Sequence, residues 1–363
     1  MPQPNINFDH LERLTDDTGL IEHCLGRIPR RKEGYSTDDN ARALWLCIEW
    51  IELLQDEPSE LKRLYGMLDR YLAFLLWAQR DDGWFHNNFY YDRTPESETR
   101  SEDCLGRSVW AVTMAYLKLN DNARRYVAAE ILRNALSACR KLRFARSQAW
   151  VLASCSKLLM EKKNSISSLE IAEDELKQLA ETCEHSLLTA YKEHRTEDWH
   201  WFEKQMTYAN GILPWGLFLS YRYNRRNETL RIAKESLDFL IEKMGGFNSS
   251  SIRPIGNRGW CSRHNRADWD QQPIDVMKLA LAANEAYHIL DDSAYLQVVL
   301  RCRDWFYGGN DHHIPLVDPS DGSCCDGLNS DGPNQNRGAE STLSYLMTEA
   351  LAHPLKLEVF EKI

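Results

Sequence analysis

The sequence has few cysteines, no long apolar run and no recognisable export signal. Ten cysteines in 363 residues are too sparse for a disulfide-stabilised scaffold, so we expect free, buried thiols in a reducing cytosol. No apolar stretch approaches the ~20 residues of a membrane span. The N-terminal segment lacks a basic stretch followed by an apolar one, so we expect no signal peptide. Together these absences predict a cytoplasmic protein that is not associated with a membrane.

Motifs for cofactors, metals and serine nucleophiles are also missing. G-x-G-x-x-G, G-x-x-x-x-G-K-[ST] and G-x-S-x-G do not occur, which removes support for a nucleotide cofactor and weakens a serine-hydrolase interpretation. Neither CxxC nor HExxH occurs, and the Asp-rich segment 316–342 lacks the spacing of an EF-hand. We therefore expect no metal and no cofactor. The formal net charge of −10 argues against nucleic-acid binding.

Helical periodicity dominates what is present. Apolar residues at 41, 44, 45, 48 and 51 lie on one helical face, whereas sustained alternation of β-branched residues is nearly absent. The pattern predicts about twelve or thirteen helices, counting a segment at each end of the chain. The expected internal helices are 39–51, 61–77, 106–119, 122–141, 146–160, 168–192, 210–222, 228–244, 272–290, 292–306 and 338–352.

Six of these helices follow a polar or glycine-containing approach. They begin near Asp39, Gly106, Arg146, Asn210, Gln272 and Ala339, at spacings of 67, 40, 64, 62 and 67 residues. Four of the spacings fit a helical hairpin with a decorated loop. Six such hairpins can close into a ring in which all inner N-termini point to one mouth. We therefore predict an all-α fold, an (α/α)6 toroid, forming a single domain over residues 1–363.

The first two approaches, 35–44 and 101–107, each carry a pair of acids followed by an arginine. Helix capping explains part of this pattern. In 35–44, however, two acids, an amide and Arg42 exceed what a cap requires. Adjacent residues on a helix point different ways, so at most one acid of each pair should face the cavity.

The approach 198–214 supplies a different kind of acid. Glu203 lies among Trp199, Trp201 and Phe202 in the sequence. A carboxyl group among aromatic rings is desolvated, which raises its pKa and suits a general acid. A structural acid paired with an arginine remains the alternative interpretation.

Three further segments are rich in polar and aromatic residues. The segment 255–276 gathers arginines, acids and tryptophans before a helix that begins with Pro273, a favourable first-turn residue. The segment 316–342 alternates aspartates with glycines and leads into the last inner helix. The segment 77–87 presents Trp84 after a turn. Amides and arginines satisfy hydroxyl groups, and indole faces stack on sugar rings.

These motifs resemble a known group of proteins. YSTDDNARAL, EDCLGRSVWA, WHWFE…TYANGILP, GWCSRHNRADWDQQP and CCDGL…NRGAEST are similar to an all-helical domain of bacterial carbohydrate clusters, which occurs alone or fused behind glycosyltransferase modules. That domain resembles the six-hairpin glycosidase superfamily with its (α/α)6 toroid, and the resemblance covers roughly residues 30–350. The superfamily includes hydrolases, epimerases and lyases. Its N-acylglucosamine epimerase branch relies on histidines, for which His86, His200 and His264 are the candidates here.

We predict a glycoside hydrolase that acts on oligosaccharides with paired carboxyl groups, by an inverting mechanism. Glu203 is the expected general acid, and the base is expected to be Asp39, Asp103 or Asp270. The residues expected to bind substrate are Asp38, Arg42, Trp84, Glu102, Arg107, Tyr208, Asn210, Trp260, Arg263, Asp268, Trp269, Gln271, Gln272, Asp326, Asn336 and Glu340. Asp326 and Glu340 are also reserve catalytic acids.

Three other interpretations stay open at this point. A sugar phosphorylase or epimerase would use the same scaffold. A noncatalytic carbohydrate-binding domain would serve a glycosyltransferase as its partner. A terpene cyclase shares the toroid, but residues 36–39 match its acidic motif only in part and residues 79–84 supply a single repeat unit.

Overall fold

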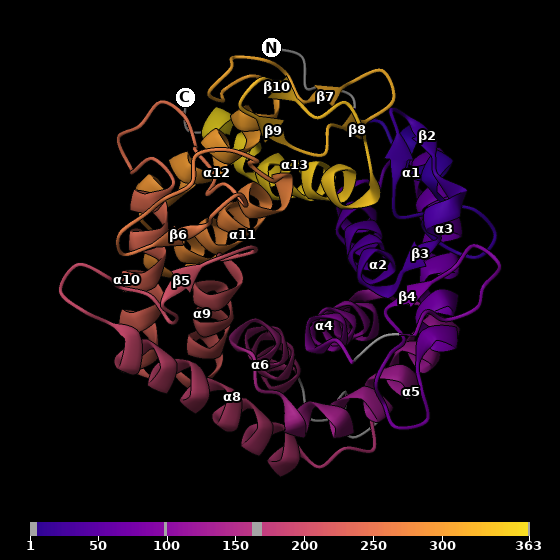
Figure 1. Ribbon diagram of the computed structural model, residues 1–363. Coiled ribbons are helices and arrows are strands. Elements are labelled where there is room, and N and C mark those ends of the chain that lie inside the picture. The colour runs from indigo at the N-terminus through magenta and orange to yellow at the C-terminus, as the bar shows by residue number, and fades with distance from the viewer. Residues whose placement is uncertain (1–5, 98–99, 162–168, 362–363) are drawn as a thin grey trace.

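The computed structural model describes residues 6–97, 100–161 and 169–361, with side chains up to residue 355. Helices alternate along the chain between an inner and an outer position and close into a ring (Figure 1). The predicted all-α toroid is confirmed. The first inner helix, α2 (Thr37–Leu53), contacts the last one, α13 (Ala339–Glu361), so the first and last hairpins are neighbours.

The inner helices begin close to the positions expected from the sequence. They are α2 (Thr37–Leu53), α4 (Glu102–Lys118), α6 (Ala145–Met160), α9 (Ile212–Asn224), α11 (Pro273–Leu290) and α13 (Ala339–Glu361). Every predicted start lies within four residues of the observed one. The outer helices are α3 (Pro58–Ala78), α5 (Asn122–Ala138), α8 (Glu173–His194), α10 (Asn227–Lys243) and α12 (Ser293–Phe306), while the short α1 (Asp9–Leu14) packs against α13.

Local sequence signals set several of these boundaries. The side chains of Ser36 and Ser101 cap α2 and α4 by accepting hydrogen bonds from the third helical N–H group. Prolines stand in the first turn of α3 and α11, where their missing N–H is not needed. Arg225 and Asp291 end α9 and α11 in the left-handed conformation. Two short 3-10 helices, Arg31–Glu33 and Cys139–Lys141, lie in loops.

The approach segments contain short antiparallel strand pairs, which the sequence pattern did not predict. The pairs are β1–β2 (Cys24–Leu25 with Ile28–Pro29), β3–β4 (Tyr35–Ser36 with Asn88–Phe89), β5–β6 (Gln205–Met206 with Cys261–Ser262), β7–β8 (Val317–Asp318 with Ser323–Cys324) and β9–β10 (Leu328–Asn329 with Gly332–Pro333). Because β3–β4 and β5–β6 join approaches to neighbouring inner helices, they fix the loops of the mouth to one another.

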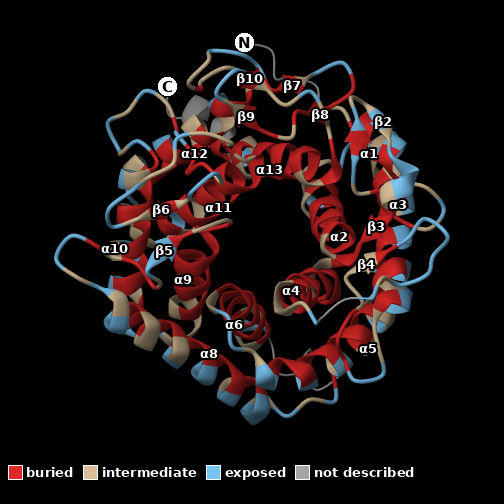
Figure 2. Cartoon of the chain, in the orientation of Figure 1, coloured by how far each residue is buried: buried red, intermediate tan, exposed pale blue. Residues whose placement is uncertain are grey.

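Tryptophan side chains fill the centre of the ring. Trp45, Trp110, Trp150 and Trp215 come from four successive inner helices, and the rings of Trp110 and Trp215 lie 4.7 Å apart in an edge-to-face contact. The inner helices are buried almost throughout, while the outer helices expose their outward faces (Figure 2). Edge-to-face packing of this kind closes the barrel beneath the mouth. No helix in the described part of the chain combines the length and the apolarity needed to cross a membrane.

Candidate functional site

Two cavities open where the N-termini of the inner helices converge. The first has a volume of about 450 Å³ and lies between α2, α11 and α13. Its wall includes Glu22, His23, Asp39, Arg42, Arg258, Asp270, Gln271, Gln272, Asp326 and Glu340. The second has a volume of about 500 Å³ and lies between α4, α6 and the approach to α9; its wall includes Glu102, Asp103, Arg146 and Tyr208.

Arg42 organises the carboxylates of the first cavity. Its Nη2 lies 3.0 Å from Asp39 Oδ1, and its Nη1 donates to Glu340 Oε2 at 2.5 Å. Arg42 is 7% exposed, so both ion pairs are poorly screened by solvent. Ser36 Oγ donates to the other oxygen of Asp39 at 2.8 Å. The predicted site residues Asp39, Arg42 and Glu340 therefore lie together in the first cavity, although Arg42 and Glu340 are 298 residues apart in the sequence.

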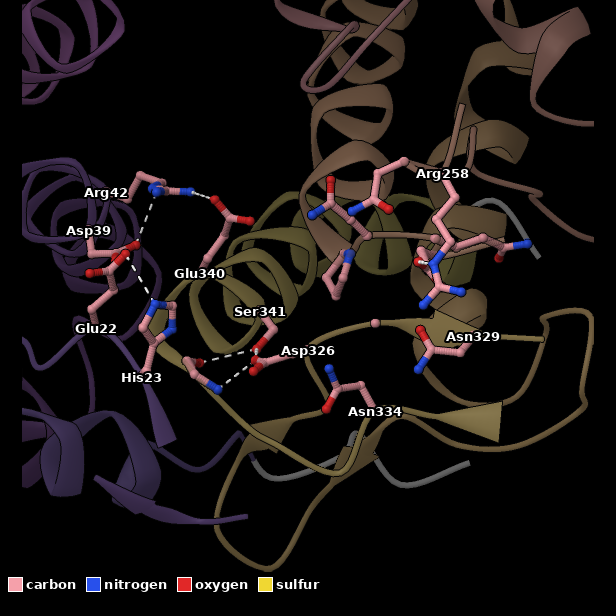
Figure 3. A pocket seen from close by; sticks show the side chains of 17 residues that line it. Glu22, His23, Asp39, Arg42, Arg258, Asp326, Asn329, Asn334, Glu340 and Ser341 are labelled. Carbon is pink, nitrogen blue, oxygen red and sulfur yellow. Dashed lines mark hydrogen bonds and ion pairs between the residues drawn. The ribbon is translucent and has the colours of Figure 1, made fainter. Parts of the chain in front are cut away.

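Glu22 adds a carboxyl group that the sequence analysis missed. Its side chain points toward Asp39 (Figure 3), and His23 Nε2 lies 3.5 Å from Glu22 Oε1. Burial and the carboxylate of Asp39 raise the pKa of Glu22 to about 8, against the attraction of Arg42. Burial also raises the pKa of Asp39. The result is an acid that stays protonated at neutral pH.

Glu340 is shifted the other way. Burial opposes its ionisation, but the charge and hydrogen bond of Arg42 prevail and lower the pKa of Glu340 below its ordinary value. Its side chain is 43% exposed, so the carboxylate faces the cavity. Asp326 lies nearby and accepts hydrogen bonds from Gly338 N and Ser341 Oγ, both at 2.6 Å. The first cavity thus contains both a protonated acid, Glu22, and an ionised carboxylate, Glu340.

The glutamines and Asp270 close the other side of this cavity. Asp270 has a positive φ of 59° and forms an ion pair with Arg258. Gln271 is fully buried, and its Nε2 donates to Asp311 Oδ2 at 2.6 Å and to Asp268 O at 3.0 Å. Its amide therefore supports the loop, while Gln272 lies at the start of α11 beside the cavity.

A second arginine pairs with one acid of α2 and one acid of α4. Arg107 Nη1 lies 2.8 Å from Asp38 Oδ2, and its Nη2 lies 3.5 Å from Asp103 Oδ2. The ring of Tyr208 stands close to the guanidinium groups of both Arg107, at 6.0 Å, and Arg146, at 5.0 Å. Asp38, Asp39 and Asp103 therefore lie in a row of ion pairs around the mouth, held by Arg107 and Arg42.

Glu102 and Glu203 have settings different from those expected. Glu102 Oε2 accepts hydrogen bonds from Arg143 N, Phe144 N and Ser147 Oγ at 2.8 to 2.9 Å, so it caps the start of α6. The desolvated setting predicted for Glu203 is wrong. Its side chain is 37% exposed and its Oε2 lies 3.2 Å from Arg146 Nη1, because Trp201 and Phe202 turn into the core. The alternative of an acid paired with an arginine describes it better.

Several predicted sugar-binding residues lie outside both cavities, and their role stays a prediction. Arg263 pairs with Asp198, and Asp268 pairs with Arg266. Trp84 is 6% exposed beneath Arg100, and Trp269 stacks on His312 at 5.0 Å. Asn336 Oδ1 accepts from Gly26 N, and Asn210 Nδ2 donates to Thr207 O. The remaining residue of this group is Trp260, which has a positive φ of 59°.

An internal repeat explains part of this arrangement. The segments 36–45 and 101–110 share the pattern S-x-D-x-x-x-R-x-x-W at a spacing of 65 residues. The pattern supplies the capping serine, the Asp38 and Asp103 carboxylates, both arginines of the row and two tryptophans of the core. Direct comparison of the two segments would have shown that Arg42 and Arg107 are equivalent.

Buried charges on α11 were also missed. Asp275 is 3% exposed, and burial raises its pKa to about 7 against the backbone N–H groups of Ala209 and Asn210. Lys278, one turn further, is fully buried. In the sequence both residues stand inside an apolar helix, and no local pattern distinguishes them from charged residues that are exposed to solvent. No cluster of His, Cys, Asp and Glu in the described ranges could hold a metal ion.

Comparison with solved structures identifies the architecture. A cellobiose 2-epimerase from Bacillus thermoamylovorans matches with a TM-score of 0.69 at 11% identity, covering 96% of each chain. A GH76 α-mannanase from Bacteroides thetaiotaomicron matches with a TM-score of 0.63 at 13% identity, covering 96% of this chain and 95% of that one. A D-mannose isomerase gives a TM-score of 0.68 at 11% identity over 98% and 100% of the two chains. The fold is thus the six-hairpin (α/α)6 toroid.

Sequence comparison adds no closer relative. No protein-family model matches the chain, and no curated protein matches it.

Proposed function

We propose that this protein is a carbohydrate-active enzyme, specifically a glycoside hydrolase that acts on oligosaccharides. The observation that carries the proposal is the pair of glutamates on either side of Arg42. Their surroundings raise the pKa of Glu22 and lower that of Glu340 within one cavity. Two carboxyl groups whose pKa values are driven apart are what glycosidic acid/base chemistry requires.

The roles follow from the two protonation states. Glu22 donates its proton to the glycosidic oxygen as the bond to the sugar breaks. The ionised Glu340 takes the proton of a water molecule that attacks the sugar ring from the opposite face, which is the inverting course. Arg42 keeps Glu340 ionised and orients it. Glu22 replaces Glu203 as the proposed acid.

The same geometry argues against a purely noncatalytic sugar-binding role. Such a protein has no need for facing carboxyl groups, and its mouth acids could all be held by arginines. Within the described residues, Glu22 and Asp326 form no ion pair with an arginine. Carboxyl groups left free to exchange protons favour catalysis over binding alone.

The test is a comparison of three glutamate variants. Wild-type protein is screened for release of new reducing ends from a panel that includes cellobiose and α-1,6-linked manno-oligosaccharides, with the anomer followed by NMR. We expect Glu22→Gln and Glu340→Gln each to lower kcat by about 10²- to 10⁴-fold. Glu203→Gln is the matched control and should retain most activity. Full activity in Glu22→Gln would refute the assignment.

An epimerase or isomerase is the second candidate, because His23 lies beside Glu22. A histidine next to a carboxyl group can move a proton at a carbon next to a sugar carbonyl. This reaction would incorporate solvent deuterium into the product without creating a reducing end. Incubation of cellobiose and D-mannose in D₂O, read by NMR, therefore separates the two activities.

Two further expectations stay predictions: a cytoplasmic location and a glycosyltransferase partner. They rest on the composition of the sequence and on the resemblance of its motifs. Co-purification with a glycosyltransferase would support the second.

A further inference from the structure

Side-chain amides line one side of the first cavity. Figure 3 shows Asn329 and Asn334 on the side away from Asp39 and Arg42. The approaches to α11 and α13 supply these amides, and Asn329 is the last residue of β9. The amide residues of the cavity wall are Asn257, Gln271, Gln272, Asn329 and Asn334. The proposed acid and base thus share a cavity with a group of amides on its other side.

Backbone hydrogen bonds between the loops fix the segments that carry these amides. Asn257 N donates to Asp270 O at 3.1 Å. Gln271 N donates to Leu328 O at 3.0 Å, and Leu328 N donates to Gln271 O at 2.9 Å, directly before Asn329. The amides are therefore presented by backbone that is held at each of these points. Groups held in place before a ligand arrives bind it with a smaller loss of conformational entropy.

Three of these amides have side chains that the fold does not use. Loop amides elsewhere in the chain bind the backbone, as Asn310 does when its Nδ2 donates to Trp305 O at 2.9 Å. Among the residues that the structure describes, the side chains of Asn257, Gln272 and Asn329 form no hydrogen bond. Their donors and acceptors are therefore available to a ligand in the cavity.

Gln272 shows most clearly that its side chain serves no local purpose. It occupies the N-cap position of α11, where serine, threonine, aspartate and asparagine commonly accept a hydrogen bond from the first turn. The side chain of Gln272 makes no such bond and lines the cavity instead. Capping therefore does not explain why a polar residue stands here.

The chemistry of the wall fits an uncharged ligand with hydroxyl groups. An amide offers donors and an acceptor, and a hydroxyl group likewise donates and accepts. Both arginines of the wall are already paired with carboxylates, Arg42 with Glu340 and Arg258 with Asp270. An anionic sugar would therefore find no unpaired arginine in this wall and would be repelled by the ionised Glu340.

We propose that Asn257, Gln272 and Asn329 are specificity-determining residues, which bind the hydroxyl groups of a neutral sugar and select it over uronic acids and sugar phosphates. The inference rests on the proposed carbohydrate function and names its substrate class. The three amides act by binding, so their role is independent of which carboxyl group transfers the proton.

The test removes each amide and measures sugar binding and stability together. The variants are Asn257→Ala, Gln272→Ala and Asn329→Ala. Asn265→Ala is the matched control, because Asn265 is an exposed asparagine of the same approach to α11 that lines neither cavity of the mouth. Binding of D-glucose, D-mannose and cellobiose is followed by calorimetry, and melting temperature by circular dichroism. D-glucuronate and D-mannuronate are the anionic counterparts of the two monosaccharides.

We expect each of the three variants to weaken binding of the neutral sugars about three- to tenfold, the loss of one hydrogen bond. The melting temperature should stay unchanged, since the replaced amides have no partner in the described part of the fold. Asn265→Ala should bind as the wild type does. The wild-type protein should bind each neutral monosaccharide at least about tenfold more tightly than its uronate.

Each outcome decides the inference. Unchanged affinity in all three variants, or an equal loss in Asn265→Ala, overturns it and leaves the proposed hydrolase intact. Uronates that bind as tightly as the neutral sugars overturn the selection of uncharged substrates. Weakened binding in the three variants combined with full activity in Glu22→Gln would support the amide wall and refute the proposed acid. Absence of binding of every neutral sugar by the wild-type protein overturns the proposed function and this inference with it.

Discussion

Replacement of Glu22 tests the site most directly. The protonation of this one residue affects both the stability of the fold and the proposed reaction, so both should change over the same pH range. Its pKa rises from an ordinary 4.5 to about 8 in the folded protein. The folded state therefore binds the proton more tightly than the unfolded chain does. The stabilisation is complete below about pH 4.5 and is lost as the pH rises through about 8.

The magnitude can be bounded from the structure. At about 1.36 kcal/mol per pH unit, the difference between the two pKa values would approach ~5 kcal/mol. The side chain of Glu22 is 31% exposed and shares its environment with Asp39. Solvent screening therefore reduces the expected change to about 1–2 kcal/mol.

Glu22→Gln supplies the comparison, because glutamine resembles the protonated carboxyl group and does not titrate. Urea unfolding of both proteins is measured near pH 5 and near pH 8.5, with the same substitution at Glu203 as a control. The wild-type protein should lose about 1–2 kcal/mol more than Glu22→Gln over this interval. Its hydrolytic activity should fall over the same range. If the free energy of unfolding changed equally with pH in the two proteins, the raised pKa of Glu22 and its assignment as the general acid would be refuted.

Two predictions concern the ring itself. Trp150→Ala should lower the free energy of unfolding by about 3–5 kcal/mol, whereas Trp77→Ala, at a side chain 45% exposed, should cost about 1 kcal/mol; equal urea midpoints would contradict the central packing. Gly211→Ala would place Cβ 2.1 Å from the carbonyl oxygen of Lys278 and should cost about 1–3 kcal/mol. If the Gly211→Ala protein had the same melting temperature as the wild type, the close approach of α9 to α11 would be contradicted.

The fold could be predicted because each inner helix carries its own signals. Apolar spacing, a capping serine or a first-turn proline occur locally, and they place Thr37, Glu102 and Pro273 at helix starts within four residues of the expected positions. Four of the five spacings lie near 65 residues and imply hairpins, and six hairpins in succession can close into a ring. The two-residue strand pairs could not be predicted, since so short a pairing leaves no periodic pattern.

The site could be predicted only in part, because sequence neighbours of a carboxyl group are not its spatial neighbours. Glu203 stands among aromatic residues in the sequence, yet those rings turn into the core and leave the carboxylate to Arg146. Glu22 stands in an ordinary stretch before β1, and its pKa is raised by burial and by the carboxylate of Asp39 on α2. Composition can locate the mouth, but the protonation state of each acid depends on the folded arrangement.

The proposed acid and the proposed base come from opposite ends of the chain. Glu22 precedes the first inner helix, Glu340 begins the last, and Arg42 joins them across the seam where the ring closes. Contacts over 298 residues carry a large loop-closure entropy, so they form only when the intervening hairpins are in place. Until then Glu340 has no arginine, and Glu22 lacks its contact with the last approach, where Ala339 N donates to Glu22 O at 2.9 Å. The opposed pKa values on which the proposed reaction depends are thus a property of the closed ring. In a protein in which the first and last hairpins do not meet, Glu22 and Glu340 would both have ordinary pKa values.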